Sequence, residues 1–277
     1  MKTVTLPSGE QVPTFGIGTW YMGEGRASRG EEIATIQHAI DMGVSLIDTA
    51  EMYAEGGAEL LVGEAIRERR ERVFLVSKVY PQNASRRSAS AACERSLRRL
   101  GTDTIDLYLL HWRGHIPLGE TVEAFERLQT AGKIRSWGVS NLDCRDMEEL
   151  LAVAGGPACS VNQVLYNLST RGIEWDLAPL CRRHGVPIMA YSPLDQGRLL
   201  KHRGLQAAAA TAGLTPAQLA VAWTLRRGDV IAIPKAATRR HLEDNLAAWN
   251  VELDTRTLDA LDRLFKPPTG PETLAML

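Results

Sequence analysis

The feature that most constrains the fold is a regular alternation of short apolar runs with amphipathic helical segments. Eight runs rich in valine, isoleucine and leucine are expected to be strands, at 15–18, 44–47, 73–77, 105–110, 134–139, 160–162, 187–190 and 230–233. Helices are expected between them, among them 29–42, 58–70, 85–100, 120–131, 144–153, 175–184 and 216–227. Strands followed by helices pair in parallel, with both faces of the sheet covered. The pattern predicts an α/β fold, a closed (β/α)₈ TIM barrel.

Glycines mark the ends of several expected helices. Gly43, Gly101, Gly132 and Gly185 stand where a helix C-terminal cap favours a left-handed residue. Thr215-Pro216 places a cap and a first-turn proline before the helix expected at 216–227.

An open, doubly wound sheet is the main alternative fold. Such sheets usually carry a glycine-rich first turn that binds a dinucleotide. The first expected strand continues as GIGTWY, which lacks the third glycine, and Gly23-Glu24-Gly25 follows no strand of its own. Segments 3–6 and 11–13 flank the turn sequence PSGE and predict an N-terminal β-hairpin before the barrel. No linker divides the chain, so residues 1–277 are expected to form one barrel domain.

Composition narrows the classes of function. The formal net charge is −1, which gives no electrostatic reason to expect a nucleic acid or a membrane as partner. The apolar runs are shorter than the ~20 residues that span a bilayer, and the N-terminus has no apolar secretory segment. The four cysteines are scattered without a Cys-x-x-Cys pair. We expect a cytoplasmic protein; a monomer is the default expectation, since the sequence does not reveal the oligomeric state.

Polar residues stand at the ends of seven of the expected strands. In a barrel of this kind the active site lies at the C-terminal ends of the strands. A single polar residue at a strand end only marks where the strand reaches water. Seven such residues facing the same end of the barrel favour an active site there. These residues are Asp48, Lys78, His111, Asn141, Gln163, Tyr191 and Lys235.

The stretch GVSLIDTAEMY, residues 43–53, brings an acid and a phenol to the same edge. A tyrosine has a pKa near 10, and a nearby ammonium lowers it by favouring the phenolate. Lys78 can supply that charge and Asp48 can hold Lys78, which makes Tyr53 a candidate general acid. His111 can orient a substrate oxygen. None of these groups donates electrons, so carbonyl reduction would need a hydride from a cofactor.

Three motifs resemble those of the aldo-keto reductase family. They are GVSLIDTA through Tyr53 with Glu59 and Gly63, then LxxLG followed by IDLYLLHW at 97–112, and IPK at 233–235. The resemblance covers nearly the whole chain. It implies a barrel that binds NADPH and reduces small aldehydes or ketones to alcohols, with Tyr53 protonating the oxygen. The family's catalytic tetrad falls on Asp48, Tyr53, Lys78 and His111.

The resemblance also implies binding residues. Asn141 and Gln163 would hold the nicotinamide carboxamide, and Tyr191 would stack on its ring. The full set implied for the cofactor is Thr19, Ser140, Asn141, Gln163, Tyr191, Ser192, Leu194, Lys235, Thr238, Arg240, His241, Asp244 and Asn245. The walls of the substrate pocket would be Trp20, Tyr80 and Trp112, together with His111.

The coenzyme end departs from the family pattern. His241 stands where an arginine often grips the 2′-phosphate, Ala236 replaces a serine, and Asp244 replaces a glutamate. The adjacent Arg239 or Arg240 could supply the missing charge. NADPH or NADP⁺ is the expected cofactor, with NADH as a weaker alternative.

Other interpretations remain open at this stage. His111 and His115 have a spacing found in metal sites, but they fall on a strand end and its loop without an acidic or cysteine partner, so no metal is expected. Trp20 and Trp112 could be ordinary core residues. A cofactor-binding barrel with a regulatory or redox-sensing role is the alternative function. Segments 195–204 and 267–277 are candidates for covering the pocket.

Overall fold

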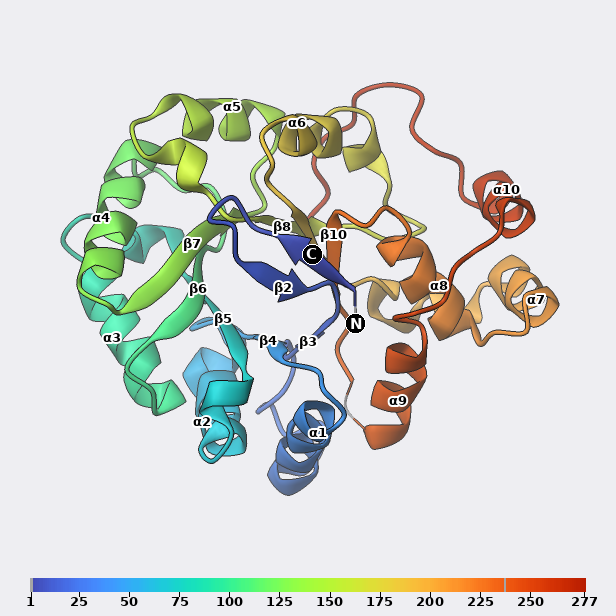
Figure 1. Ribbon diagram of the computed structural model, residues 1–277, viewed down its shortest axis with the longest axis horizontal. Coiled ribbons are helices and arrows are strands. Elements are labelled where there is room, and N and C mark those ends of the chain that lie inside the picture. Colours follow the sequence, from blue (N-terminus) through green and yellow to red (C-terminus); the bar gives the residue numbers. More distant parts are fainter. Residues whose placement is uncertain (1, 237) are drawn as a thin grey trace.

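The structure is a computed structural model that describes residues 2–236 and 238–277, and it is a barrel of parallel strands (Figure 1). Within these described residues, eight parallel strands lie in the order β10-β9-β8-β7-β6-β5-β4-β3, and an antiparallel pair, β1 and β2, precedes them. The hairpin strands are β1 (Thr3–Thr5) and β2 (Gln11–Pro13). The barrel strands are β3 (Gly16–Gly18), β4 (Leu46–Asp48), β5 (Phe74–Val79), β6 (Ile105–Leu110), β7 (Ile134–Ser140), β8 (Asn162–Leu165), β9 (Ile188–Tyr191) and β10 (Val230–Ile233).

The first and last barrel strands meet and close the sheet. Parallel bridges join Phe15 to Ala232 and Gly18 to Lys235. The amide of Ala232 donates a hydrogen bond of 2.8 Å to the Thr14 carbonyl. The predicted closed barrel is therefore confirmed, and the alternative open sheet is wrong.

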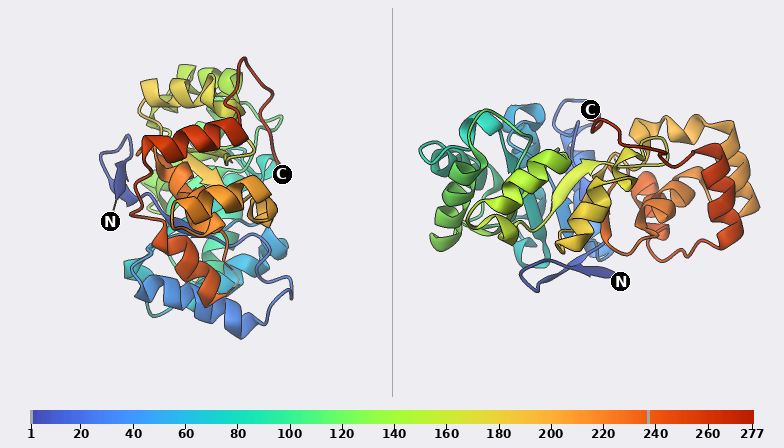
Figure 2. Two further views of the ribbon diagram at one scale, coloured as in Figure 1. Left: turned by 90° about the vertical axis from the view of Figure 1, so that its right-hand side faces the viewer. Right: turned by 90° about the horizontal axis from the view of Figure 1, so that it is seen from above.

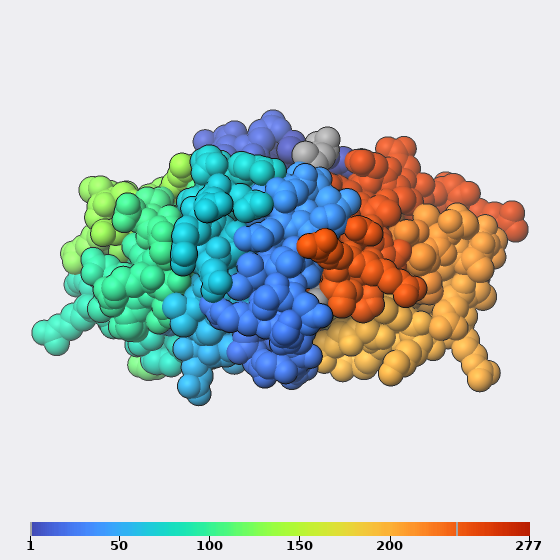
Figure 3. Space-filling model, turned by 90° about the horizontal axis from the view of Figure 1, so that it is seen from below, coloured from blue at the N-terminus to red at the C-terminus, as the bar shows by residue number. Residues whose placement is uncertain are grey.

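Helices surround the barrel and follow most of the expected segments. They are α1 (Arg29–Asp41), α2 (Gly57–Ile66), α3 (Ala89–Leu100), α4 (Leu118–Thr130), α5 (Cys144–Ala152), α6 (Leu177–Arg183), α7 (Arg203–Thr211), α8 (Pro216–Leu225), α9 (Arg239–Ala247) and α10 (Thr255–Leu264). Helices α1 and α9 lie side by side outside the seam where β3 meets β10 (Figure 3). A hydrogen bond of 2.8 Å between His38 Nε2 and Glu243 Oε1 joins the two helices. Within the described residues, no helix has the length and hydrophobicity to cross a membrane.

The helix ends confirm the predicted caps and correct several boundaries. The four glycines predicted to follow helices all have positive φ, with Gly101 at 64° as the cap of α3. Thr215 and Gln218 form a reciprocal capping box at the start of α8. Helix α2 ends at Ile66, earlier than expected, because the chain turns into a short 3₁₀ segment, and α3 begins only at Ala89.

Strand residues divide by parity between two apolar layers. Leu46, Val76, Leu107 and Leu109 belong to one cluster, inside the barrel. Their neighbours, such as Ile47, Leu75 and Tyr108, belong to the larger cluster between strands and helices. Successive side chains of a strand point to opposite faces, so each strand contributes side chains to both apolar layers. A side chain's parity thus decides whether it enters the barrel.

The N-terminal hairpin closes one end of the barrel. Val4, Leu6 and Val12 are buried and pack in the same cluster as the inward-facing strand residues. Figure 2 shows the hairpin and the C-terminal tail at opposite ends of the barrel. The predicted hairpin is confirmed, and the remaining open end is the end at which the strands terminate.

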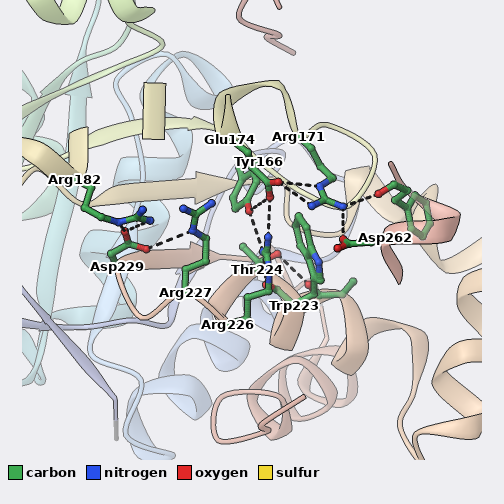
Figure 4. A network of polar contacts seen from close by, with 12 residues as sticks. Tyr166, Arg171, Glu174, Arg182, Trp223, Thr224, Arg226, Arg227, Asp229 and Asp262 are labelled. Atoms are coloured by element: carbon green, nitrogen blue, oxygen red, sulfur yellow. Dashed lines mark hydrogen bonds and ion pairs between the residues drawn. The ribbon is translucent and has the colours of Figure 1, made fainter. Parts of the chain in front are cut away.

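A polar network fastens the C-terminal helix to the barrel (Figure 4). Glu174 accepts hydrogen bonds from Arg171 and Arg226, each at 2.8 Å. Arg171 also donates to Asp262 of α10 at 2.7 Å and to the Phe265 carbonyl at 2.6 Å. The tail that follows Phe265 therefore starts from a fixed point.

Candidate active site

Three members of the tetrad predicted from the sequence lie at inward-facing positions at the open end of the barrel. Asp48 is the last residue of β4 and lies two positions after Leu46, which points inward. Lys78 lies two positions after Val76 on β5, and His111 two positions after Leu109 of β6. Because parity repeats every two residues, the strands that build the apolar interior also deliver these polar groups above it.

Lys78 is the centre of a buried hydrogen-bond network. Its Nζ donates to Asp48 Oδ2 at 2.8 Å, to the Thr49 carbonyl at 2.8 Å and to Tyr53 Oη at 3.1 Å. The other oxygen of Asp48 accepts a hydrogen bond of 2.7 Å from Gln163 Nε2. The three donor hydrogens of the ammonium therefore all have partners, which fixes its position.

Tyr53 reaches this network from an unusual turn after β4. It begins a short 3₁₀ segment, Tyr53–Gly56, in which Ala54 and Glu55 have positive φ values of 50° and 53°. Such backbone conformations are costly for residues other than glycine, and they cluster at functional sites. The turn brings the phenol back over the end of β4, as the GVSLIDTAEMY stretch suggested.

Burial decides the protonation of the phenol. Desolvation, with the Asp48 carboxylate as the second cause, raises the pKa of Tyr53 well above its usual value. Burial also lowers the pKa of Lys78, although the charge of Asp48 opposes that shift. The sequence predicted a net lowering of the pKa of Tyr53 by Lys78, but burial is the largest influence and the net direction is upward. Tyr53 keeps its proton at neutral pH, as a proton donor must.

His111 is a neutral imidazole beside the phenol. Burial first, and the Lys78 charge second, lower its pKa well below the usual value. Its ring lies edge-on to Tyr53, with centroids 5.8 Å apart, and 4.9 Å from the ring of Trp112. Among the described residues its Nδ1 has no hydrogen-bond partner and is enclosed, so Nε2 is the nitrogen that can face a ligand in the cavity.

These groups open into a cavity of about 540 Å³. Trp20, Tyr53, His111 and Trp112 form its aromatic end, so the two tryptophans are wall residues and not merely core. Tyr80 lies outside the lining and packs edge-on against Trp112 at 5.8 Å, so it supports that wall from behind.

Most residues implied for the cofactor line the same cavity. They are Ser140, Asn141, Gln163, Tyr191, Ser192, Leu194, Lys235, His241, Asp244 and Asn245. Three others do not line it. The Thr19 hydroxyl donates a hydrogen bond of 2.9 Å to the Asp48 carbonyl, Thr238 is the N-cap of α9, and Arg240 is exposed. His115 is also exposed, and the described residues contain no cluster of three or more potential metal ligands.

Asn141 links the candidate nicotinamide site to the tetrad. It accepts a hydrogen bond of 3.0 Å from Tyr191 Oη and donates one of 3.1 Å to the His111 carbonyl. Asn141 and Ser192 both have positive φ, at 57° and 48°. The cavity thus joins amide groups, an aromatic face and the cation Lys235 in one channel, and this set fits a nicotinamide dinucleotide.

Sequence reasoning missed other lining residues. Tyr21 and Arg26 come from the loop between β3 and α1, which carries no recognisable motif. The segments named as candidate covers do reach the cavity: Gln196, Gly197 and Leu200 come from one, and Met276 and Leu277 from the other. No local signal marks Arg26, because its position depends on how that loop folds.

Comparison with known proteins agrees with this geometry. The model of the aldo/keto reductase family matches residues 14–266. The chain belongs to the aldo/keto reductase family. It is 50% identical to methylglyoxal reductase YeaE of Escherichia coli over 100% of this chain and 99% of that protein. It is 36% identical to glyoxal reductase of Bacillus subtilis over 95% of this chain and 93% of that protein.

A solved structure is also similar along the whole chain. The aldo/keto reductase of Klebsiella pneumoniae, in complex with NADP and acetate, is 53% identical, with a TM-score of 0.97. That alignment covers 100% of this chain and 99% of the other. The family predicted from the sequence is thereby confirmed, and the names of these relatives agree with the predicted reduction of small aldehydes with NADP(H).

Proposed function

We propose that this protein reduces the aldehyde group of small 2-oxoaldehydes such as methylglyoxal, using NADPH. The observation that carries this proposal is the Lys78–Tyr53 pair beside Asp48 and His111, at the base of a small aromatic cavity. The relatives named for methylglyoxal and glyoxal reduction support the substrate class. A compact dicarbonyl suits a site walled by Trp20 and Trp112.

The position of each residue indicates its role in the proposed reaction. The bound nicotinamide supplies the hydride. Tyr53, protonated because it is buried, gives its proton to the carbonyl oxygen, and the Lys78 ammonium at 3.1 Å stabilises the phenolate that remains. Asp48 holds Lys78 at 2.8 Å. His111, being neutral, donates a hydrogen bond to the same oxygen without competing for the proton.

Binding of the cofactor would use the rest of the channel. Asn141 and Gln163 would hold the carboxamide, Tyr191 would stack on the ring, and Lys235 with the residues of α9 would hold the adenosine end. Ser192 and Leu194 would lie against the diphosphate. The family resemblance implies these roles, and the shared lining of one cavity supports them.

The test is NADPH oxidation with a panel of carbonyl compounds. Methylglyoxal and glyoxal should give the highest kcat/KM, and bulky aromatic ketones the lowest. A regulatory or redox-sensing barrel would bind NADPH and turn over none of them, and no observation favours that role. Uniformly negligible turnover across the panel would therefore reject the proposed reaction.

We further propose that the protein acts in the cytoplasm as a monomer. All four cysteines are free thiols, and three of them are buried, which suits a reducing compartment. Light scattering coupled to size-exclusion chromatography, in reducing buffer, would measure the mass in solution, and a dimer mass would reject the monomer.

A further inference from the structure

The loop between β3 and α1, residues 19–28, contributes a cation to the cavity that the proposed mechanism does not use. Arg26 lines the cavity, as does Lys235, which follows β10. Since β3 and β10 meet at the barrel seam, these two cations reach one channel from the two sides of that seam.

The Arg26 side chain is held in a stack. Its Cζ lies 3.7 Å from the centroid of the Tyr21 ring, and Tyr21 stacks on Trp20 with centroids 4.5 Å apart. Trp20 in turn faces Tyr53 at 6.4 Å. A guanidinium that stacks by its face leaves its N–H edge free for a planar or branched oxyanion. Glu24 approaches that edge, with Oε2 3.3 Å from Nε, and the Arg26 side chain is still 57% exposed.

The base of the loop is rigid. The Gly23 amide donates a hydrogen bond of 2.9 Å to Glu32 Oε2, and Met22 is fully buried. Gly23 has φ of +77°, and a side chain there would come within 3.1 Å of the Gly57 backbone. The loop therefore presents Arg26 from a fixed platform, which reduces the entropy lost on binding a ligand.

The charges near Arg26 leave room for an anion. Asp244, the acidic group of the adenosine end, accepts hydrogen bonds from Thr215 at 3.0 Å and from Gln218 at 2.9 Å, so it is turned towards α8. Burial lowers the pKa of Lys235, the charges of Glu32 and Glu24 oppose that shift, and the charge of Arg26 adds to it. An anion bound between two cations reduces the electrostatic repulsion between them.

We propose that Arg26 binds a phosphate group of the cofactor opposite Lys235, and so supplies a guanidinium where this chain has His241 instead of arginine. The ligand chemistry is a phosphoryl oxyanion, either the 2′-phosphate or the diphosphate of the dinucleotide. The inference rests on the proposed use of NADPH, and its test requires no carbonyl substrate.

The experiment measures the Kd of NADP⁺ and NAD⁺ by isothermal titration calorimetry for four proteins. They are the wild type, Arg26→Ala, Arg26→Lys and the control Arg29→Ala. Arg29 lies three residues further on, is similarly exposed at 51%, pairs with Glu64 and lies outside the cavity. We expect Arg26→Ala to lose about ten- to a hundredfold in NADP⁺ affinity, because that is the usual contribution of charge-assisted hydrogen bonds.

Each outcome decides the proposal. A loss for NADP⁺ alone assigns Arg26 to the 2′-phosphate, and an equal loss for NAD⁺ assigns it to the diphosphate. Arg26→Lys should recover only part of the loss, because lysine has the charge without the planar fork. Affinities of Arg26→Ala within twofold of the wild type for both ligands, as expected for Arg29→Ala, would overturn the proposal. If the wild type binds cofactor but reduces no 2-oxoaldehyde, only the substrate assignment fails.

Discussion

At the residue scale, the proposed role of Tyr53 as proton donor depends on the groups around its hydroxyl. Tyr53→Phe removes the phenolic proton and keeps the ring against His111 and Trp20. We expect kcat for aldehyde reduction to fall by about 10²–10⁴, the usual contribution of a positioned general acid. Cofactor affinity and Tm should stay close to those of the wild type. Activity within a few-fold of the wild type would remove Tyr53 from the mechanism.

Lys78 should show its role in the pH dependence of the reverse reaction. Alcohol oxidation needs Tyr53 as a base, that is, as phenolate, and burial already raises the pKa of Tyr53. Lys78→Met removes the hydrogen bond of 3.1 Å to Tyr53 Oη, so the pKa of Tyr53 should rise further. The pH–rate profile of alcohol oxidation should move to higher pH, with a lower rate at pH 7. An unchanged profile, with chemistry rate-limiting, would argue against this coupling.

We expect the choice of coenzyme to depend on Lys235 and on the residue at position 241. Lys235→Ala should weaken NADPH more than NADH, because only NADPH has a 2′-phosphate for Lys235 to hold. His241→Arg should widen the preference, since a guanidinium can bind phosphate in a bidentate way. The ratio of kcat/KM for the two coenzymes measures both effects. Equal harm to NADH and NADPH in Lys235→Ala would mean that Lys235 is not the partner of the 2′-phosphate.

The sequence predicted which residues gather at the site better than it predicted their chemistry. Asp48, Lys78 and His111 could be found because each ends an apolar strand with inward parity. The direction of the pKa of Tyr53 could not, because it depends on desolvation by side chains distant in sequence. The sequence also did not predict that the Thr19 hydroxyl donates a hydrogen bond to the Asp48 carbonyl and does not line the cavity.

At the element scale, α2 packs against the end of α3 through a glycine. A Cβ at Gly63 would lie 2.6 Å from the carbonyl oxygens of Arg99 and Leu100, closer than atoms approach. Gly63→Ala must therefore push the two helices apart, and we expect it to lower the free energy of unfolding by about 1–3 kcal/mol.

The matched control is Gly30→Ala in the first turn of α1. A Cβ there meets nothing within 4 Å, so the substitution should raise the free energy of unfolding by about 0.4–1 kcal/mol. Urea denaturation of the two variants measures both changes. A destabilised Gly30→Ala together with an unaffected Gly63→Ala would contradict this account of the packing.

Elements with strong periodicity and caps were the predictable ones. The capping box at Thr215 and the glycine after α3 placed two helix ends correctly. Strand β8 was expected from Ser160, but it begins at Asn162 and continues through Gln163 to Leu165. Helices α7, α9 and α10 were not among the expected segments, although α9 buries Leu242 and α10 begins at the N-cap Asp254 and buries Leu261.

At the scale of the whole molecule, the network around Glu174 ties the C-terminal helix to the barrel. Burial alone would raise the pKa of Glu174, but hydrogen bonds from Arg171, Tyr166 and Arg226 outweigh it and lower that pKa. A carboxylate with a lowered pKa stabilises the fold above its unfolded pKa, near 4.3, and this stability is lost as the pH falls through the folded value.

Glu174→Gln should therefore lower stability at pH 7, by about 3 kcal/mol, because two partly buried arginines lose their charge partner. It should also flatten the loss of stability that the wild type shows below about pH 4.5. Urea denaturation at pH 7 and pH 4 measures both effects. Glu243→Gln, at an exposed ion pair, is the control and should change little. Equal effects of the two substitutions would contradict the role of the network.

The contact between Gln163 and Asp48 has a consequence for how the protein is made. These residues are 115 positions apart, and the bridge between Gly18 and Lys235 joins the two ends of the barrel. Asp48 and Tyr53 leave the ribosome early, yet they lack their distant partners until most of the chain has been synthesised. A nascent or truncated chain can contain Asp48, Tyr53 and Lys78, but it has neither the complete channel nor Lys235. Enzyme activity therefore reports the arrival of the last strand, and incomplete translation products should remain catalytically silent.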